Sequence, residues 1–318
     1  MARSVAFLAQ NRPDSADFFE KKATYIFQKS DRLDLWFEAQ TASAKNIENP
    51  IDAVNFVRNR QNKGWREPNT AKEWKAKIRF GNMGGYISES NLGDYQLARA
   101  FYEQSFADFS AHLGTSEKKT AYYLLGNLGN ICTRLGDYER ARILLKQKAD
   151  LGFQNGDRAI AADALHNLAI ALRETGQLDS AIALEKRAIE QPENPDRPLK
   201  TTYLSGLAGY FLLKNDLNEA EKACRAARLA YQKLPKDKQS IVAFALGGMA
   251  ETEAGICLAR KQFSVAKANY FRSLRLTAAE FGDENRRETA KLRIQIGEIE
   301  LLEGHPMAAL GYFQTALQ

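Results

Sequence analysis

Three cysteines and three histidines are the residues of this 318-residue chain best suited to nucleophilic chemistry. Cys132, Cys224 and Cys257 lie far apart and form no C-x-x-C pair, so the spacing indicates neither a disulfide framework nor a redox motif. Cys132 and His166 would be a nucleophile and its base, but no known catalytic signature surrounds them, and buried cysteines are usually inert. We therefore expect reduced, buried thiols.

The spacing of possible metal and phosphate ligands gives no better support for a reaction. His112, His166 and His305 lack a second ligand at the i+4 spacing of helical zinc motifs. The glycines of FGNMGGY, residues 80–86, have no strand before them and no GK[ST] after them, as a phosphate loop requires. The sequence thus predicts no catalytic residue, no metal and no cofactor, and it predicts that the protein is not an enzyme.

The elements that position these residues are visible in two near-copies of one pattern between residues 121 and 190. The first copy reads GNLGNICTRLGDYERARILLKQKA and the second LHNLAIALRETGQLDSAIALEKRAI. Gly136 and Gly176, 40 residues apart, have the permissive backbone that ends a helix. Apolar residues recur at i, i+3 and i+4 between small ones, as expected for two helices that cross closely. The small positions are Gly129, Ala141, Ala169 and Ala181.

The same pattern extends over most of the chain. We predict repeats near residues 76–115, 121–156, 161–192, 201–234, 247–281 and 289–318. Their turn positions are Gly93, Gly136, Gly176, Asn215, Lys261 and Gly304. Before them, residues 1–75 are predicted to form degenerate helical hairpins, with a break around Gly64 and Pro68.

This spacing of small, apolar and turn residues resembles the tetratricopeptide repeat family, in a long form of about 40 residues rather than 34. The resemblance implies an all-α fold, a right-handed superhelical solenoid of stacked antiparallel helix pairs. About six or seven pairs are expected. It also implies a concave groove that binds a protein or peptide partner.

In such arrays position six of the first helix lies on the concave wall, and here it holds Asn82, Asn127 and Asn167. An asparagine amide offers both a donor and an acceptor, so it can pair with a peptide group. The resemblance implies that this row holds an extended main chain. The alternative is that these amides are solvated or make local bonds at helix ends. In later repeats the position holds Gly206, Thr252 and Gln295.

Six neighbouring side chains complete the predicted partner-binding groove: Tyr123, Asn130, Arg134, His166, Arg173 and Glu174. Arg134 and Arg173 together would suit the recognition of carboxylates. The alternative is that both arginines are ordinary solvated charges.

Composition argues against several other classes of protein. The net charge of +6 comes from 45 basic and 39 acidic residues spread along the chain, without the clustering that a nucleic-acid site needs. The first residues, MARSVAFLAQNRPDS, contain too short an apolar run for a signal peptide, and no run reaches transmembrane length. We expect a cytoplasmic protein.

The end of the chain suggests a larger system. Gln318 falls within a predicted second helix, and no polar capping helix follows, so we expect the natural protein to continue; a tolerated edge or a dimer are alternatives. The segments WREPNTAKEW (65–74), GNMGGY, GNLGN and AALGYFQTALQ resemble bacterial tetratricopeptide arrays that precede a CHAT domain, a caspase-like peptidase domain. That resemblance implies a sensor array that regulates a protease in cis or in trans.

The sequence therefore predicts a non-catalytic scaffold that binds an extended peptide or protein in its concave groove. Two alternatives remain open: the regulatory part of a CHAT-type protease system, and a basic helical-repeat protein that binds RNA. Binding to RNA would weaken steeply with salt, whereas a hydrogen-bonded peptide groove would be less sensitive.

Overall fold

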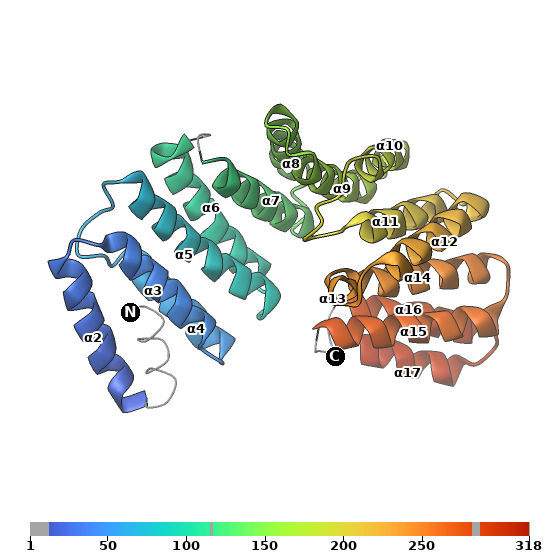
Figure 1. Cartoon of the computed structure of the whole chain (residues 1–318). Helices are drawn as coiled ribbons and strands as arrows, with labels where there is room; N and C mark the ends of the chain where they lie inside the picture. The colour runs from blue at the N-terminus through green and yellow to red at the C-terminus, as the bar shows by residue number, and fades with distance from the viewer. Residues whose placement is uncertain (1–12, 115–116, 282–286, 318) are drawn as a thin grey trace. The chain divides into compact units, whose positions relative to one another are not determined.

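The computed structural model describes residues 13–114, 117–281 and 287–317, and these form α-helices joined by short connections (Figure 1). The chain divides into two compact units, residues 1–151 and 152–318. In the described residues the only extended pairing is an isolated bridge between Asn194 and Arg197. The predicted all-α fold is confirmed.

The first unit holds the described helices up to the last turn of α8. They are α2 (Pro13–Lys29), α3 (Leu33–Lys45), α4 (Pro50–Arg60), α5 (Ala71–Ser90), α6 (Tyr95–His112), α7 (Lys118–Arg134) and α8 (Tyr138–Gln154). The predicted boundary at residue 75 remains a prediction.

The second unit continues the succession of helix pairs. Its helices are α9 (Arg158–Glu174), α10 (Leu178–Ile189), α11 (Lys200–Leu213), α12 (Leu217–Lys233), α13 (Lys236–Gln239), α14 (Phe244–Ala259), α15 (Phe263–Phe281), α16 (Arg287–Leu302) and α17 (Pro306–Ala316), with a 3-10 turn at Ser240–Val242. Each of the pairs α9/α10, α11/α12, α14/α15 and α16/α17 packs together, and α11 also packs against α9 and α14.

The turn inside each of six repeats has the same left-handed backbone. Two residues after the end of the first helix, or three in the case of Gly93, a residue has a positive φ: Gly93 (65°), Gly136 (80°), Gly176 (75°), Asn215 (60°), Lys261 (59°) and Gly304 (83°). After Gly93 the Asp94 amide donates to the Ser88 carbonyl, six residues earlier; in the other five turns the next amide donates to a carbonyl five residues earlier, as from Gln262 to Cys257 at 2.9 Å. This is the Schellman arrangement that closes a helix end. All six predicted turn positions are confirmed, including the two without glycine.

Small residues lie where the two helices of a pair cross. A Cβ atom added at Gly129 would lie 2.7 Å from the Leu145 side chain, and one at Gly297 would lie 2.6 Å from Phe313. The small position of the second helix holds an alanine with no exposed surface, such as Ala141 or Ala181. Helix separation is therefore set by residues that have almost no side chain.

The predicted break before the regular repeats is also present. The helix α5 begins after it with a capping box, in which Thr70 and Glu73 each accept a bond from the other's backbone amide at 3.2 Å. Arg66 donates to both oxygens of the Glu73 carboxylate, and this hydrogen bonding lowers the pKa of Glu73. The segment around Gly64 and Pro68 is thus a fixed entry into α5.

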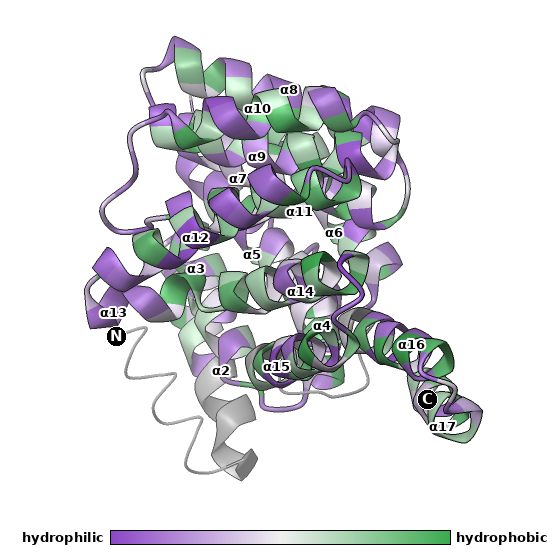
Figure 2. Cartoon of the chain, turned by 90° about the vertical axis from the view of Figure 1, so that its right-hand side faces the viewer, coloured by the Kyte–Doolittle hydropathy of each residue, from purple (hydrophilic) through white to green (hydrophobic). Residues whose placement is uncertain are grey.

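Apolar and polar residues alternate around most of the helices, as Figure 2 shows in green and purple. Over the described part of the chain, no single helix combines the length and apolar character of a membrane span. Residues 236–242 and 244–259 reach that composition only as a pair, and the chain bends by 60° between them.

Replacing Lys261 with glycine should raise the free energy of unfolding by about 0.5–1 kcal/mol, because a lysine in the left-handed region carries strain that glycine does not. Lys261 is exposed, so few contacts are lost. The measurement is chemical denaturation of the whole chain.

The matched control is Lys261→Ala, which removes the same charge but keeps a Cβ atom and hence the strain. It should leave stability nearly unchanged. Equal stabilisation by glycine and alanine would show that charge, and not backbone strain, is the cause.

Candidate functional site

On the first unit, two of the predicted asparagines bind each other. The Asn127 side-chain amine donates to the Asn82 carbonyl oxygen at 3.0 Å, which links the first helices α5 and α7 of successive repeats. Both side chains are half-buried. This bond uses the NH2 group of Asn127 and the carbonyl oxygen of Asn82. The NH2 group of Asn82 and the carbonyl oxygen of Asn127 therefore keep bonding capacity for another molecule. Sequence reasoning placed these residues together but did not foresee the bond between them.

The other predicted residues of the first unit have different surroundings. Tyr123 has 68% of its surface exposed, and Asn130 is half-buried. Arg134 lies 3.4 Å from a Glu89 oxygen and donates to the Tyr95 hydroxyl at 3.3 Å. Its guanidinium also lies over the Tyr95 ring, 5.3 Å from the centroid. Arg134 is therefore already neutralised within its own unit.

The second unit contains a groove of about 440 Å³, lined almost entirely by the first helices of its pairs. The helices α9, α11, α14 and α16 supply every lining residue but one, which comes from α15. The residues are His166, Ile170, Arg173, Thr202, Ser205, Gly206, Gly209, Tyr210, Leu212, Leu213, Phe244, Ala245, Gly248, Glu251, Thr252, Tyr270, Lys291 and Gln295. Of the predicted site residues, the groove includes His166 and Arg173.

Three neutral polar atoms of this groove have no hydrogen-bond partner among the described residues. They are the Thr202 hydroxyl, the Tyr210 hydroxyl and the Gln295 carbonyl oxygen, and all three atoms are buried. Tyr210 is only 2% exposed, and burial raises the pKa of its hydroxyl, which therefore stays protonated. A buried polar group without a partner is costly, so these three atoms have hydrogen-bonding capacity that the described chain does not use.

The charged residues of the groove each have a partner of opposite sign. Lys291 contacts a Glu251 oxygen at 2.7 Å, and Arg173 contacts the neighbouring Glu174 carboxylate. The predicted role of Arg173 in carboxylate recognition stays a prediction, but Glu174 competes for the same guanidinium.

His166 forms the third such pair. Its Nδ1 atom lies 2.7 Å from an oxygen of Glu185, a carboxylate with no exposed surface. Burial raises the pKa of Glu185; burial of His166 acts to lower its own pKa, but the adjacent carboxylate outweighs this and raises it. One proton is therefore held between the two groups more firmly than in the unfolded chain. Because Glu185 lies 19 residues away on α10, no local spacing pointed to it.

Asn167, the third asparagine of the predicted row, is half-buried on α9 and does not line the groove. The groove is also lined by residues that the sequence analysis missed. The apolar side chains of Leu213 and Phe244 are 59% and 41% exposed at the groove. Leu213 is the last residue of α11, and Phe244 follows the 3-10 turn at the start of α14, so the helical periodicity indicated neither residue.

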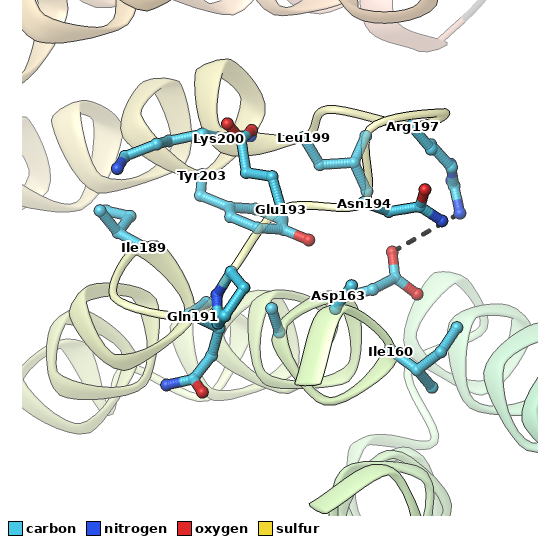
Figure 3. Close-up of a pocket in the computed structure, with 14 residues that line it drawn as sticks. Ile160, Asp163, Ile189, Gln191, Glu193, Asn194, Arg197, Leu199, Lys200 and Tyr203 are labelled. Atoms are coloured by element: carbon cyan, nitrogen blue, oxygen red, sulfur yellow. Dashed lines mark hydrogen bonds and ion pairs between the residues drawn. The ribbon is translucent and has the colours of Figure 1, made fainter. Parts of the chain in front are cut away.

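A smaller pocket lies between α9 and the connection from α10 to α11 (Figure 3). The figure shows Asp163 on α9 facing Arg197 of the connection, and their charged atoms are 3.9 Å apart. The Lys200 amide donates to Glu193 at 2.8 Å and ties the connection to the start of α11. The free volume, about 40 Å³, holds a few water molecules at most. This pocket is a packing feature of the connection.

Within the described ranges, the fold brings together one group of possible metal ligands. Ligand atoms of Glu300, Glu303 and His305 lie within 4.8 Å of one another. The Lys267 ammonium lies 2.9 Å from the Glu300 carboxylate and 2.5 Å from that of Glu303. A lysine thus already occupies the position from which a cation would neutralise these carboxylates.

The proposed nucleophile has no chemical activation in this structure. Cys132 has no exposed surface, and burial raises the pKa of its thiol, which disfavours the reactive thiolate. His166, its suggested base, is bonded to Glu185.

Comparison with known proteins supports the repeat type. The family model described as tetratricopeptide repeat matches residues 119–194, the segment with the two near-copies. No curated protein sequence matches the chain.

Similar solved structures extend this likeness over nearly the whole chain. The apo form of RapI has a TM-score of 0.63 at 13% identity, covering 94% of this chain and 96% of that one. A Rap protein complexed with competence and sporulation factor has a TM-score of 0.60 at 14% identity, covering 96% of this chain and 92% of that one. BtubC (BKLC) from P. vanneervenii has a TM-score of 0.56 at 16% identity, covering 68% of this chain and 88% of that one. The chain shares with them the fold, a helical-repeat solenoid of the tetratricopeptide type.

The His166–Glu185 pair should make the protein less stable as pH rises. The folded state binds an extra proton, so its stabilisation is complete below the usual histidine value of 6.5 and is lost as pH rises through the higher folded pKa. Unfolding free energy measured by denaturant at several pH values should fall above pH 6.5.

In Glu185→Gln this fall should disappear, because the histidine loses the carboxylate that holds its proton. His305→Gln, which removes a histidine with 59% of its side chain exposed, is the control and should keep the wild-type slope. The same slope in Glu185→Gln as in wild type would contradict the assignment.

Proposed function

We propose that this protein is a non-catalytic scaffold that binds an extended segment of a partner protein along the first helices of its repeats. The observation that carries the proposal is the groove of the second unit. Its wall is built from first helices, its charges are paired, and three of its buried polar atoms have no partner in the described chain. A polypeptide segment supplies the missing donors and acceptors in a regular row.

A solved neighbour supports the same kind of function. The Rap protein with a similar fold was obtained in complex with competence and sporulation factor, so this architecture accommodates a bound partner. The low identity of 14% carries no residue of that complex over to this chain.

The asparagine row belongs to the same proposal. Asn82 and Asn127 already form a rigid pair on α5 and α7, and each retains one amide group to bond a main chain. Asn167 offers the equivalent amide on the second unit. A pre-ordered amide loses less conformational entropy on binding than a free one.

A regulatory role beside a CHAT-type protease remains a narrower form of this proposal, in which the bound partner is the protease or its activator. RNA binding has less support, because the cationic side chains of the groove, Arg173 and Lys291, are each paired with a carboxylate. An RNA site would need basic groups left to face phosphates.

Replacing Asn82, Asn127 and Asn167 together with alanine should abolish capture of the partner from native lysate. The triple replacement removes the amide groups that are left to bond a main chain, while the helices keep their apolar contacts. Capture at moderate salt with nuclease present, analysed by mass spectrometry, measures this.

The control is Asn218→Ala on the second helix α12, an exposed asparagine outside the proposed site. Circular dichroism should show equal helicity in all variants. If the triple variant captures the same proteins as wild type, the asparagines are ordinary surface.

A further inference from the structure

We propose that the groove of the second unit selects an uncharged, extended stretch of its partner, with one apolar side chain placed against Leu213 and Phe244. This inference rests on the proposed scaffold function and names the chemistry of the segment that is bound. Three independent features of the groove lead to it: unpartnered neutral polar atoms, paired charges, and exposed apolar side chains together with one open glycine, Gly209.

The unpartnered atoms match the groups of a peptide main chain. The hydroxyls of Tyr210 and Thr202 can donate or accept, and the Gln295 carbonyl oxygen accepts. They lie on α11 and α16, so two walls of the groove present neutral hydrogen-bonding groups. Main-chain amides, which alternate donors and acceptors, satisfy such groups without bringing a charge.

The paired charges disfavour a charged ligand. His166, Arg173 and Lys291 are the cations of the groove, and each contacts a carboxylate of the same unit. A ligand carboxylate would have to displace one of these carboxylates, and a ligand cation would have to displace His166, Arg173 or Lys291. In either case one charge would be left without its partner, at a desolvation cost that an uncharged segment avoids.

The apolar side chains and glycines provide the space for a neutral segment. Leu213 and Phe244 expose 59% and 41% of their surface at the groove. At Gly209 an added Cβ atom would meet nothing nearer than the Thr252 hydroxyl at 3.8 Å. Since that position is open, a main chain can approach α11 closely, as glycine surfaces permit. An apolar ligand side chain covers Leu213 and Phe244 and removes their surface from water.

The test uses the whole chain and a displayed library of random linear peptides as the probe. Wild-type protein should enrich peptides with an uncharged core and an apolar residue. Titration of an enriched peptide should then show about tenfold or greater weakening by Leu213→Asp and also by Leu213→Arg, since either charge faces an apolar side chain.

Leu229→Asp is the matched control. Leu229 is a leucine of the same unit on α12, 56% exposed, and it does not line the groove. It should leave the affinity unchanged. Because both leucines are exposed, thermal unfolding of all three variants should stay near that of wild type.

A second pair of variants tests the hydrogen bonds alone. Tyr210→Phe keeps the buried ring and removes only the hydroxyl, and it should weaken binding about three- to tenfold. Tyr203→Phe, on the same helix and also buried, lies at the smaller pocket and should have no effect.

Enrichment of peptides with a charged core, or equal effects of Leu213→Asp and Leu229→Asp, would overturn the inference. Failure to enrich any peptide would also overturn it, and lysate capture with the asparagine variant would then judge the scaffold function separately. If wild-type protein self-associates and Leu213→Asp abolishes this, the occupant is a second copy of the chain and the proposal is wrong.

Discussion

The close approach of the two helices in each repeat is the constraint on which the structure depends. Where Gly129 meets Leu145, a single added carbon would overlap the neighbouring side chain, and the alanine that faces this region, Ala141, is fully buried. Helices held this close need a turn of fixed shape, which the left-handed residue between them supplies. The same spacing is repeated along each unit, so the first helices lie side by side and expose one face.

Much of this could be predicted from the sequence because the repeat signal is local. Lys261 was assigned to the turn by register alone, and its backbone is left-handed like that of Gly136. The contacts that define the candidate site are different, because they join residues from separate helices. The bond from Asn127 to Asn82 and the pair of His166 with Glu185 depend on how repeats stack, and no periodicity encodes them.

The proposal that the groove of the second unit serves recognition has a simple electrostatic basis. Its cations contact carboxylates of the same unit, as Lys291 contacts Glu251, so the charges of the groove compensate one another. What remains is a set of neutral hydrogen-bonding atoms, such as the Tyr210 hydroxyl, beside exposed apolar side chains. The proposed ligand, a segment of polypeptide, would use this combination by drawing affinity from its main chain and selectivity from one side chain.

The central claim, that partners bind to the first-helix faces, is tested most directly by photo-crosslinking in native lysate. A photoreactive phenylalanine analogue would replace Phe244 at the groove or, for comparison, Phe271 on the second helix α15, since both side chains are similarly exposed. We predict a specific partner adduct from position 244 and none from position 271. Adducts of equal yield from both positions, or from position 271 alone, would contradict the account.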